Sequence, residues 1–411
     1  MDLLEKVSDA NSLIEAFNRS KRGSDWKESV QKYEMNLLSN VYETQTAIRN
    51  GTYEQRNFVE FELNERGKSR QIKSIHISDR VVQRSLCDNA LVPYLEKYLI
   101  YDNGASMKHK GIGFARERIE THLHKFYRKY GNDGYVLLID FSKFFDNIPH
   151  EKLVKAIGEK IKDDRLMDFV RQAIGTFKVD VSYMDGDEYK HCMDMLFNSL
   201  AYSKIDKALL TGGKFMPKSV GIGAQISQIS GVFYPTAIDT YCKIVKGIKY
   251  YARYMDDIYI IHQDKQFLKD ILEDIKKISE EYGLFINTKK TQIIKLSHGF
   301  TFLKVKYILT DSGHLIKKLL PKAFTRERRK LKKYAKRLEE GKMPYKDIEN
   351  AYKSWRGNVD KFHNARSLAN MDRLYNELFI KPFIEGGQRD GDINSRGRNC
   401  RIKSGDSEQT G

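Results

Sequence analysis

Two adjacent aspartates, Asp256 and Asp257, lie in the middle of the apolar and aromatic stretch YYARYMDDIYII, residues 250–261. Adjacent like charges repel each other, and a buried carboxylate is costly unless another group neutralises it. The apolar runs on both sides predict two short strands with the acids at the turn between them. An Asp-Asp pair in a β-turn is commonly only turn chemistry. The apolar flanks favour a second interpretation, in which the two carboxylates hold a divalent cation.

A third acidic residue, Asp140, ends the apolar run YVLLIDF. The run is short and continuous, which predicts a buried strand, and ligands usually bind beyond strand ends in α/β layers. Three carboxylates could hold two Mg²⁺ ions roughly 4 Å apart, an arrangement that activates an attacking oxygen and stabilises a leaving one. Asp146 follows six residues later. We expect it at a helix start, where an acid is a good cap, and give it a structural role.

The composition bounds the class of protein. The chain has 411 residues, of which 40% are hydrophobic and 31% charged, which predicts a folded protein of two or three subdomains. No apolar run approaches the roughly 18 residues needed to cross a bilayer, and the N-terminus lacks the features of a signal peptide. A cytoplasmic location without a membrane partner is expected. The four cysteines form no CxxC pair, which predicts reduced thiols without a zinc site.

The net charge of +17 indicates a polyanionic partner, with RNA or DNA as the leading candidate. An anionic membrane surface is the alternative, but no strongly apolar amphipathic face supports it. Nine lysines and arginines and one acid lie between Lys322 and Arg337. This segment predicts a helix with Leu331, Tyr334 and Leu338 on one stripe and a basic face left free for phosphates. The oligomeric state is left open.

Periodicity along the rest of the chain predicts alternating helices and strands. Helices are expected over residues 1–50, 79–99, 115–131, 151–177, 226–248, 267–283 and 345–381. Pro235 should kink the helix at residues 226–248 or set its start later. Strands are expected over residues 285–296 and 299–309, and a hairpin whose turn is at residues 64–67. Residues 178–222 have a mixed pattern, and the glycine- and charge-rich tail predicts disorder.

The ordered motifs together resemble those of bacterial reverse transcriptases. The two acidic motifs, DFSKFFD and YMDD, are a little over a hundred residues apart, and the other blocks occur in the family's order: Lys68-Ser69-Arg70, Asp79-Arg80 with Gln83, GIGAQISQ, GLFINTKKT and FTFLKVKY. The block from Ile222 to Gln228 lacks the proline-rich form of intron and retron enzymes. It resembles the enzymes of diversity-generating retroelements and of defence-associated antiviral reverse transcriptases. Lys304 stands where glycine is usual, which places the tightness of that turn in question.

The resemblance implies an α+β, right-hand polymerase fold. It has fingers, a palm with an antiparallel sheet backed by helices, and a helical thumb. The implied boundaries are N-terminal helices and fingers at residues 1–129, palm at 130–312 with a fingers insertion around 157–215, helical thumb at 313–382 and a disordered tail at 383–411.

The same resemblance implies roles for particular residues. Asp140, Asp256 and Asp257 would hold two Mg²⁺ ions, with the backbone carbonyl of Phe141 as a further ligand. Lys290 would protonate the departing pyrophosphate, although Lys289 beside it is an alternative. The implied substrate contacts are a steric gate against the ribose 2′-hydroxyl at Phe145, triphosphate contacts at Lys68 and Arg70, and nucleotide and template contacts at Gly223, Ser227 and Gln228.

The implied reaction is RNA-directed DNA synthesis from deoxynucleoside triphosphates, with an RNA template and a DNA or RNA primer. Two alternatives stay open. One is an RNA-binding or maturase-like scaffold in which polymerisation is incidental. The other is protein-primed or untemplated DNA synthesis, for which the 24 tyrosines offer candidate primers. Antiviral defence, diversification and an intron-type role are not separated by the sequence.

Overall fold

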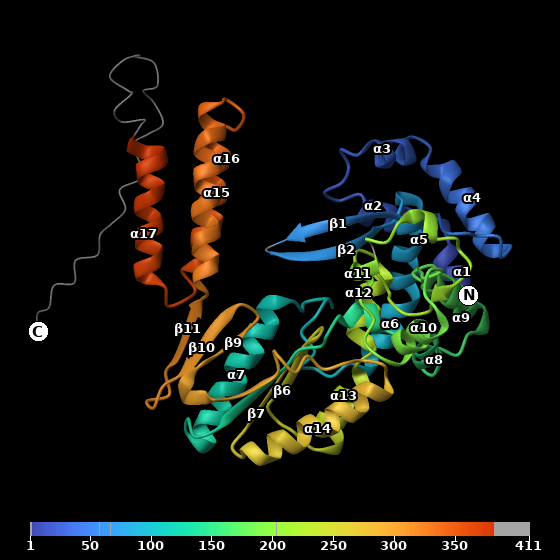
Figure 1. Ribbon diagram of the computed structural model, residues 1–411. Helices are drawn as coiled ribbons and strands as arrows, with labels where there is room; N and C mark the ends of the chain where they lie inside the picture. Colours follow the sequence, from blue (N-terminus) through green and yellow to red (C-terminus); the bar gives the residue numbers. More distant parts are fainter. Residues whose placement is uncertain (1, 57, 66, 203, 382–411) are drawn as a thin grey trace, which may run out of the picture. The chain divides into compact units, whose positions relative to one another are not determined.

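The computed structural model describes residues 2–56, 58–65, 67–202 and 204–381 (Figure 1). Two compact units divide the chain: residues 1–303 with 309–315 form the first, and residues 304–308 with the chain from 316 onward form the second. The tail for which the sequence predicts disorder lies outside the described residues, as does Cys400. The other three cysteines are buried free thiols.

The first unit begins with four helices, as periodicity predicts for residues 1–50: α1 Leu3–Ser8, α2 Ala10–Ser20, α3 Glu28–Met35 and α4 Leu37–Arg49. Asp2 and Asp9 cap α1 and α2 by accepting backbone N–H groups. The apolar face of α2 packs on α5, Ile77–Leu86, with Leu13 and Phe17 fully buried. These helices form a small core of their own.

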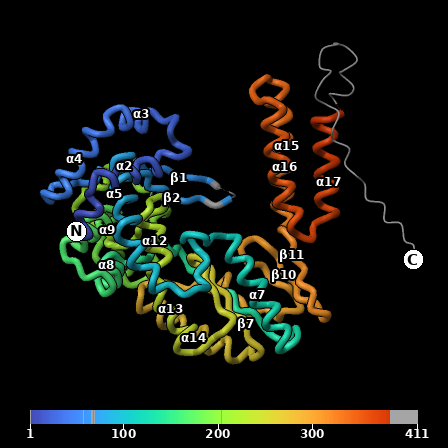
Figure 2. Tube along the Cα trace, turned by 180° about the vertical axis from the view of Figure 1, so that it is seen from behind, coloured from blue at the N-terminus to red at the C-terminus, as the bar shows by residue number. Residues whose placement is uncertain are grey.

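The predicted hairpin is present as β1, Val59–Glu65, and β2, Lys68–Ser74, in antiparallel register with Leu63 opposite Arg70. Both views show it projecting from the N-terminal helices (Figures 1 and 2). Its base is fixed because the Lys73 N–H donates to the carbonyl of Ile222 at 3.2 Å. The hairpin is therefore tied to the loop that precedes α12, Gln225–Phe233.

The central sheet of the first unit has four antiparallel strands in the order β6-β7-β3-β8. Their bounds are β6 Tyr251–Tyr254, β7 Asp257–His262, β3 Tyr135–Ile139 and β8 Gln292–Lys295. Both apolar runs that flank the aspartates are strands, as predicted. Strand β7 is buried along four consecutive residues because helices cover both faces of the sheet.

Helix α7, Ile112–Tyr130, and helix α14, Lys265–Glu281, pack on β7. Tyr259 contacts His122 of α7, whereas Ile258 and Ile260 point to the opposite face and belong to the core that includes the apolar stripe of α14. Asp264 caps α14 through the N–H of Gln266, and Gly283 at a φ of 72° follows its end, as predicted.

The remaining elements of the first unit surround this sheet. Pro235 does interrupt the long helix predicted around it, since α12 ends at Phe233 and α13 spans Thr236–Thr240. Residues 178–222 contain only short pieces. The other bounds are η1 Cys87–Leu91, α6 Val92–Leu95, η2 Glu96–Tyr98, η3 Phe144–Asn147, α8 His150–Gly158, α9 Asp164–Gly175, β4 Val179–Asp180, α10 Gly186–Asp194, α11 Ser199–Tyr202, η4 Lys207–Leu209, β5 Phe215–Met216, η5 Tyr241–Val245, η6 Leu296–His298 and β9 Phe300–Phe302.

The second unit is a small sheet followed by three helices: β10 Val305–Leu309, β11 Leu315–Leu319, α15 Pro321–Glu339, α16 Tyr345–Val359 and α17 Ala365–Tyr375, extended by η7 Asn376–Ile380. The predicted apolar stripe of α15 packs into the core of this unit, with Leu331 fully buried. Trp355 of α16 meets the ring of Phe324 on α15 edge-on, with ring centroids 6.0 Å apart, so it packs between these two helices.

One tight turn differs from what its sequence suggests. Leu303 and Lys304 both adopt positive φ, 44° and 66°, between β9 and β10. Positive φ at both loop residues is the geometry of a two-residue hairpin turn, which usually takes glycine or asparagine. The turn therefore forms with lysine in place of glycine. Among the described residues, no helix is both long and apolar enough to cross a membrane.

Candidate active site

The register of the central sheet brings the acidic motifs together. Ile139 pairs with Ile258 in the antiparallel ladder, so the next position of each chain segment places Asp140 opposite Asp257. Opposite residues of an antiparallel pair have Cα atoms about 4.5–5.5 Å apart and side chains on the same face. Two carboxylates distant in sequence therefore share one edge and one face of the sheet.

Asp256 is in the two-residue loop that joins β6 to β7, since Tyr254 pairs with Asp257. Met255, the first loop residue, has a φ of 54°. A non-glycine residue in this region is uncommon and persists only when its surroundings hold it. The loop is thus a strained support for the two aspartates.

A buried ion pair between Arg253 and Asp239 fixes that loop through a hydrogen bond to its backbone. Arg253, which is 1% exposed, donates to both carboxylate oxygens of Asp239, through Nε at 2.8 Å and Nη2 at 2.6 Å. Its Nη1 donates to the carbonyl of Met255 at 3.1 Å, and Nη2 also reaches the carbonyl of Val232 at 2.8 Å. The hydroxyl of Tyr251 donates to Asp239 as well, at 2.5 Å. One guanidinium therefore joins β6, α12, α13 and the aspartate loop.

Lys290 lies directly against the third acid. Its Nζ is 2.7 Å from Oδ1 and 2.9 Å from Oδ2 of Asp140. The backbone brings it there, because the Asn287 N–H donates to the Asp140 carbonyl at 2.8 Å and the Lys290 N–H donates to the Asn287 carbonyl at 3.1 Å. The prediction for Lys290 thus falls on a residue that contacts the site.

The carbonyl of Phe141 points toward the side of β7. Its bridge to Ile286 is made by the flanking residues: the Ser142 N–H donates to Phe285, and the Asp140 carbonyl accepts from Asn287. The peptide groups of Phe141 itself therefore point away from that bridge. Its side chain is buried in the core at 3% exposure.

The donors at this edge fit Mg²⁺ by their chemistry. They are carboxylate and carbonyl oxygens, and Mg²⁺ is usually bound through one or two carboxylates together with substrate phosphates. The Lys290 ammonium already occupies a cation position beside Asp140. Within the described part of the chain, no three His, Cys, Asp or Glu side chains form a ready metal cluster. A metal site here would accordingly be completed by substrate.

Phe145 and Asp146 lie on η3, directly beyond β3. The ring of Phe145 meets that of Phe144 edge-on at 5.2 Å and packs on α12, where a Cβ added to Gly231 would lie 2.9 Å from it. Phe144 is the core aromatic of the two, and Phe145 is half-buried. Asp146 accepts from the N–H and hydroxyl of Ser199 at the start of α11, a structural contact. Burial raises the pKa of its carboxyl.

The block before and within α12 contains three further predicted residues. Gly223 has a φ of 120°, and an added Cβ would lie 3.3 Å from the carbonyl of Lys73, so glycine allows the β1–β2 hairpin to approach. The buried hydroxyl of Ser227 donates to the carbonyl of Val220, which fixes the loop. Gln228 is exposed one residue further along.

The two predicted triphosphate contacts are on β2. Arg70 is exposed, opposite Leu63. Lys68 begins the strand, but its side chain lies outside the described part of the structure. The structure therefore places one of these two side chains on the surface of the hairpin.

A cluster of polar side chains lies between β7 and α7 and bonds Tyr259, two residues after Asp257. The Tyr259 hydroxyl and His122 Nδ1 are 2.9 Å apart. Asp102 lies 3.7 Å from His122 and binds Arg118 at 2.6 Å and Lys243 at 2.7 Å. Burial lowers the pKa of His122 to about 4, against the weaker opposite effect of Asp102.

Sequence reasoning missed Arg253 and Asp239. The only local signal is an arginine inside an otherwise apolar strand, since a buried charge requires a partner. Its partner, Asp239, is on helix α13, and only the fold shows that the two residues meet.

An antiparallel sheet whose edge carries paired acids between two covering helices, with a hairpin bonded to the loop before α12, defines a palm-type nucleic acid polymerase fold. Residues 62–307 match the family described as reverse transcriptase (RNA-dependent DNA polymerase). This match covers more than half of the chain, and the chain belongs to that family. The predicted α+β, right-hand polymerase class is confirmed.

Curated relatives are distant. The chain is 27% identical over 212 residues to a COX1/OXI3 intron 2 protein of Saccharomyces cerevisiae, covering 44% of this chain and 24% of that protein. It is 24% identical over 269 residues to protein YkfC of Escherichia coli strain K12, covering 60% of this chain and 65% of YkfC. The chain thus spans less than two thirds of either relative.

Solved structures give weaker similarities. Apo telomerase from Candida tropicalis has a TM-score of 0.41 at 17% identity, covering 69% of this chain and 53% of that one. Telomerase from Candida albicans with a fragment of telomeric RNA has a TM-score of 0.41 at 17% identity, covering 70% and 50%. Similarities at this level do not by themselves establish a shared function.

Proposed function

We propose that this chain is an RNA-directed DNA polymerase that synthesises cDNA on an RNA template. The observation that carries the proposal is the register of β3 and β7, which sets Asp140 opposite Asp257 beside the Asp256 loop. Turn chemistry alone would not require a second acid on the same face of the neighbouring strand. Membership in the reverse transcriptase family supports the same reaction.

The three aspartates and the Phe141 carbonyl would hold two Mg²⁺ ions. When bound, these ions would supply electrostatic stabilisation of the charge that develops during nucleotidyl transfer. In the reaction, the primer 3′-oxygen attacks the α-phosphate of a deoxynucleotide, a new phosphodiester bond forms and the bond to pyrophosphate breaks. Lys290, held at Asp140 before substrate binds, would then donate a proton to the leaving pyrophosphate.

The remaining predicted residues would position the substrates. Arg70 and Lys68 would bind the triphosphate, and a guanidinium suits this because its planar fork binds phosphate oxygens in pairs. Phe145, backed by Gly231, would leave no room for a ribose 2′-hydroxyl. Gln228 would face the template strand while Gly223 and Ser227 shape the loop beneath it.

The motif order assigns a role in binding nucleic acid to each segment of the chain. We assign residues 1–129 to N-terminal helices and fingers, 130–312 to the palm with an insertion around 157–215, and 313–382 to the thumb. The basic face of α15 would follow the template–primer backbone, with salt-sensitive affinity. A cytoplasmic enzyme of a bacterial or phage defence system, or of a diversity-generating retroelement, is the setting that the motifs favour. The neighbouring genes would distinguish these settings.

Primer extension tests the proposal. Purified protein is given a DNA primer on an RNA template, deoxynucleotides and Mg²⁺, and the product is sequenced. We expect complementary cDNA, and a loss of at least about 10²-fold for Asp140→Asn, Asp256→Asn and Asp257→Asn. Asp270→Asn is the matched control, because that acid is exposed on α14 and bonds only Gln266 among the described residues. Equal activity of all four variants would refute the assignment.

The main alternative is an RNA-binding, maturase-like scaffold, which the intron 2 relative favours. It predicts that Asp256→Asn leaves the biological function intact. Protein-primed or untemplated synthesis predicts random or homopolymeric product in the same extension assay.

A further inference from the structure

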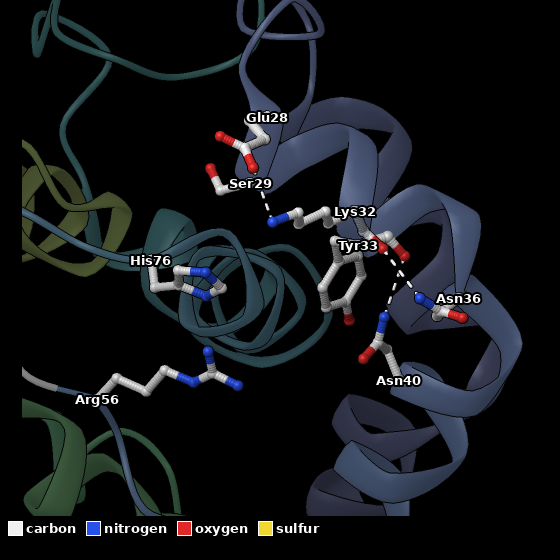
Figure 3. A pocket seen from close by; sticks show the side chains of 8 residues that line it. All are labelled: Glu28, Ser29, Lys32, Tyr33, Asn36, Asn40, Arg56 and His76. Carbon is white, nitrogen blue, oxygen red and sulfur yellow. Dashed lines mark hydrogen bonds and ion pairs between the residues drawn. The ribbon is translucent and has the colours of Figure 1, made fainter.

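A polar groove lies at the base of the fingers hairpin, away from the aspartates in the sequence and assigned to no step above. It consists of two adjoining pockets, of about 430 Å³ and 250 Å³, that share Ser29, Arg56 and His76. These volumes suit a nucleotide-sized group. The first is lined by Glu28, Ser29, Lys32, Tyr33, Asn36, Asn40, Arg56 and His76 (Figure 3). The second adds Lys27, Val30, Val59, Ser74, Ile75, Ile77 and Arg80.

One side of the groove is cationic. Figure 3 shows the side chains of Arg56 and His76 extending toward the space in front of Tyr33. Neither Arg56 nor Arg80 forms an ion pair with any described residue, and Lys27 lies over the ring of Trp26 at 5.6 Å. The backbone N–H of Arg56 donates to Asp79 at 3.3 Å, and the charge of Arg56 opposes the rise in pKa that burial gives the Asp79 carboxyl. Two guanidinium groups that form no ion pair within the described part of the chain favour an anion with several oxygens.

His76 supplies a neutral donor on the same side. Its Nδ1 accepts the N–H of Ser78 at 3.3 Å, where it caps α5, so the remaining ring proton is on Nε2. Burial first, and then the charge of Arg56, lowers the pKa of His76. The imidazole can therefore donate to phosphate without adding charge.

The other side of the groove offers acceptors. The amide nitrogen of Asn40 donates to the carbonyl of Tyr33 at 3.0 Å, which leaves the side-chain oxygen of Asn40 toward the groove. The charges of Lys32 and Glu28 neutralise each other at 2.7 Å. A phosphodiester of a nucleic-acid backbone carries only acceptors, so it would not use this side. A ribose 2′-hydroxyl is a donor, and it is what separates RNA from DNA.

We propose that this groove binds the backbone of single-stranded RNA, with phosphates on Arg56 and Arg80 and a ribose hydroxyl near Asn40. The groove adjoins the base of β1 and β2 through Val59 and Ser74. An RNA strand held there would be presented along the fingers hairpin. The identity of the strand as template rests on the proposed function, whereas its binding does not.

The test measures affinity without deoxynucleotides or Mg²⁺, so its outcome is independent of catalysis. A fluorescein-labelled, unstructured 20-nucleotide RNA is titrated with full-length protein at several salt concentrations, and the anisotropy is recorded. For Arg56→Gln with Arg80→Gln we expect about tenfold weaker binding and a salt slope that is smaller by about 1.4, since each single-strand phosphate contact contributes about 0.7.

The matched control is Arg22→Gln with Arg49→Gln, which removes the same charge from exposed positions outside the groove. An equal change in affinity and slope for both double variants would overturn the proposal. DNA of the same sequence lacks the ribose 2′-hydroxyl and should bind the wild-type protein less tightly than RNA; equal affinity of the wild-type protein for DNA and RNA would overturn the assignment to RNA. If the double variant fails to fold by circular dichroism, Lys27→Gln is tested, together with crosslinking of 4-thiouridine RNA to the wild-type protein. Crosslinks absent from residues 27–40 would refute the site.

Discussion

Replacing Arg253 by lysine tests whether the buried ion pair holds the aspartate loop in place. The guanidinium makes four hydrogen bonds, two to Asp239 and one each to the carbonyls of Met255 and Val232. A lysine ammonium keeps the charge but is a single point with a shorter reach. It cannot serve the carboxylate in a bidentate way and also reach both carbonyls.

The magnitude follows from the bonds lost. At least two hydrogen bonds of a charged group disappear, each worth about 1.5–3 kcal/mol, so Arg253→Lys should cost about 3 kcal/mol or more. Asp239→Asn leaves the buried guanidinium without its counter-ion and should cost about 3–5 kcal/mol. These losses are large against a total stability of about 5–15 kcal/mol. The matched control is Arg171→Lys, whose exposed pair with Asp168 should cost less than about 1 kcal/mol.

Two assays separate stability from loop position. Urea unfolding followed by circular dichroism gives the loss of stability. Primer extension is then measured at a temperature where Arg253→Lys is folded, and we expect about 10²-fold lower activity, because an ångström of misplacement can cost that much. Full activity of the folded variant would show that the bond to Met255 does not position the aspartates. Additive effects of Arg253→Met and Asp239→Leu in the double variant would refute coupling within the pair.

Three further outcomes are expected. Lys290→Met should lower the primer extension rate by about 10²–10⁴-fold while reducing the Mg²⁺ concentration for half-maximal activity, because Asp140 loses a competing cation; an unchanged Mg²⁺ titration would contradict the contact. The pKa of His122, about 4, lies below its usual value of 6.5, so the neutral imidazole stabilises the fold above pH 6.5 and this contribution is lost as pH falls toward 4. The free energy of unfolding measured with urea should therefore change less between pH 6.5 and 4 in His122→Gln than in the wild type. The same dependence on pH in both proteins would refute this role of His122. Phe145→Ala should raise ribonucleotide over deoxynucleotide incorporation by about 10–200-fold, measured with matched CTP and dCTP, whereas an unchanged ratio would exclude a gate.

The sequence predicted much of the central sheet because its strands are short, apolar and bounded by turns. It also predicted the break at Pro235 and the apolar stripe of α15, where a local rule decides the outcome. Residues 178–222 were not assigned because their short elements are held by distant contacts. For example, the buried Lys218 Nζ donates to the carbonyl of Cys192 at 2.9 Å.

The candidate site was predicted residue by residue but not as a network. Lys290 and Asp140 are 150 residues apart in the chain, so no spacing rule predicts their contact. Ser227 shows the opposite case: a motif position expected near substrate has its hydroxyl bonded to Val220 in the interior. Motifs identify which residues matter, whereas only the fold shows which of them face the substrate and which shape the loops.

The register of β3 against β7 is the feature on which the site depends most. A slip of one residue would move Asp140 to the opposite face from Asp257. The apolar pattern cannot prevent such a slip, because β7 is buried on both faces. Polar contacts can prevent the slip. The Tyr259 hydroxyl bonds His122 on one face of the sheet, and Arg253 bonds both Asp239 and the carbonyl of Met255 in the adjoining loop. The buried polar groups around the sheet therefore specify the alignment that the apolar strands leave open, and with it the placement of Asp140 opposite Asp257.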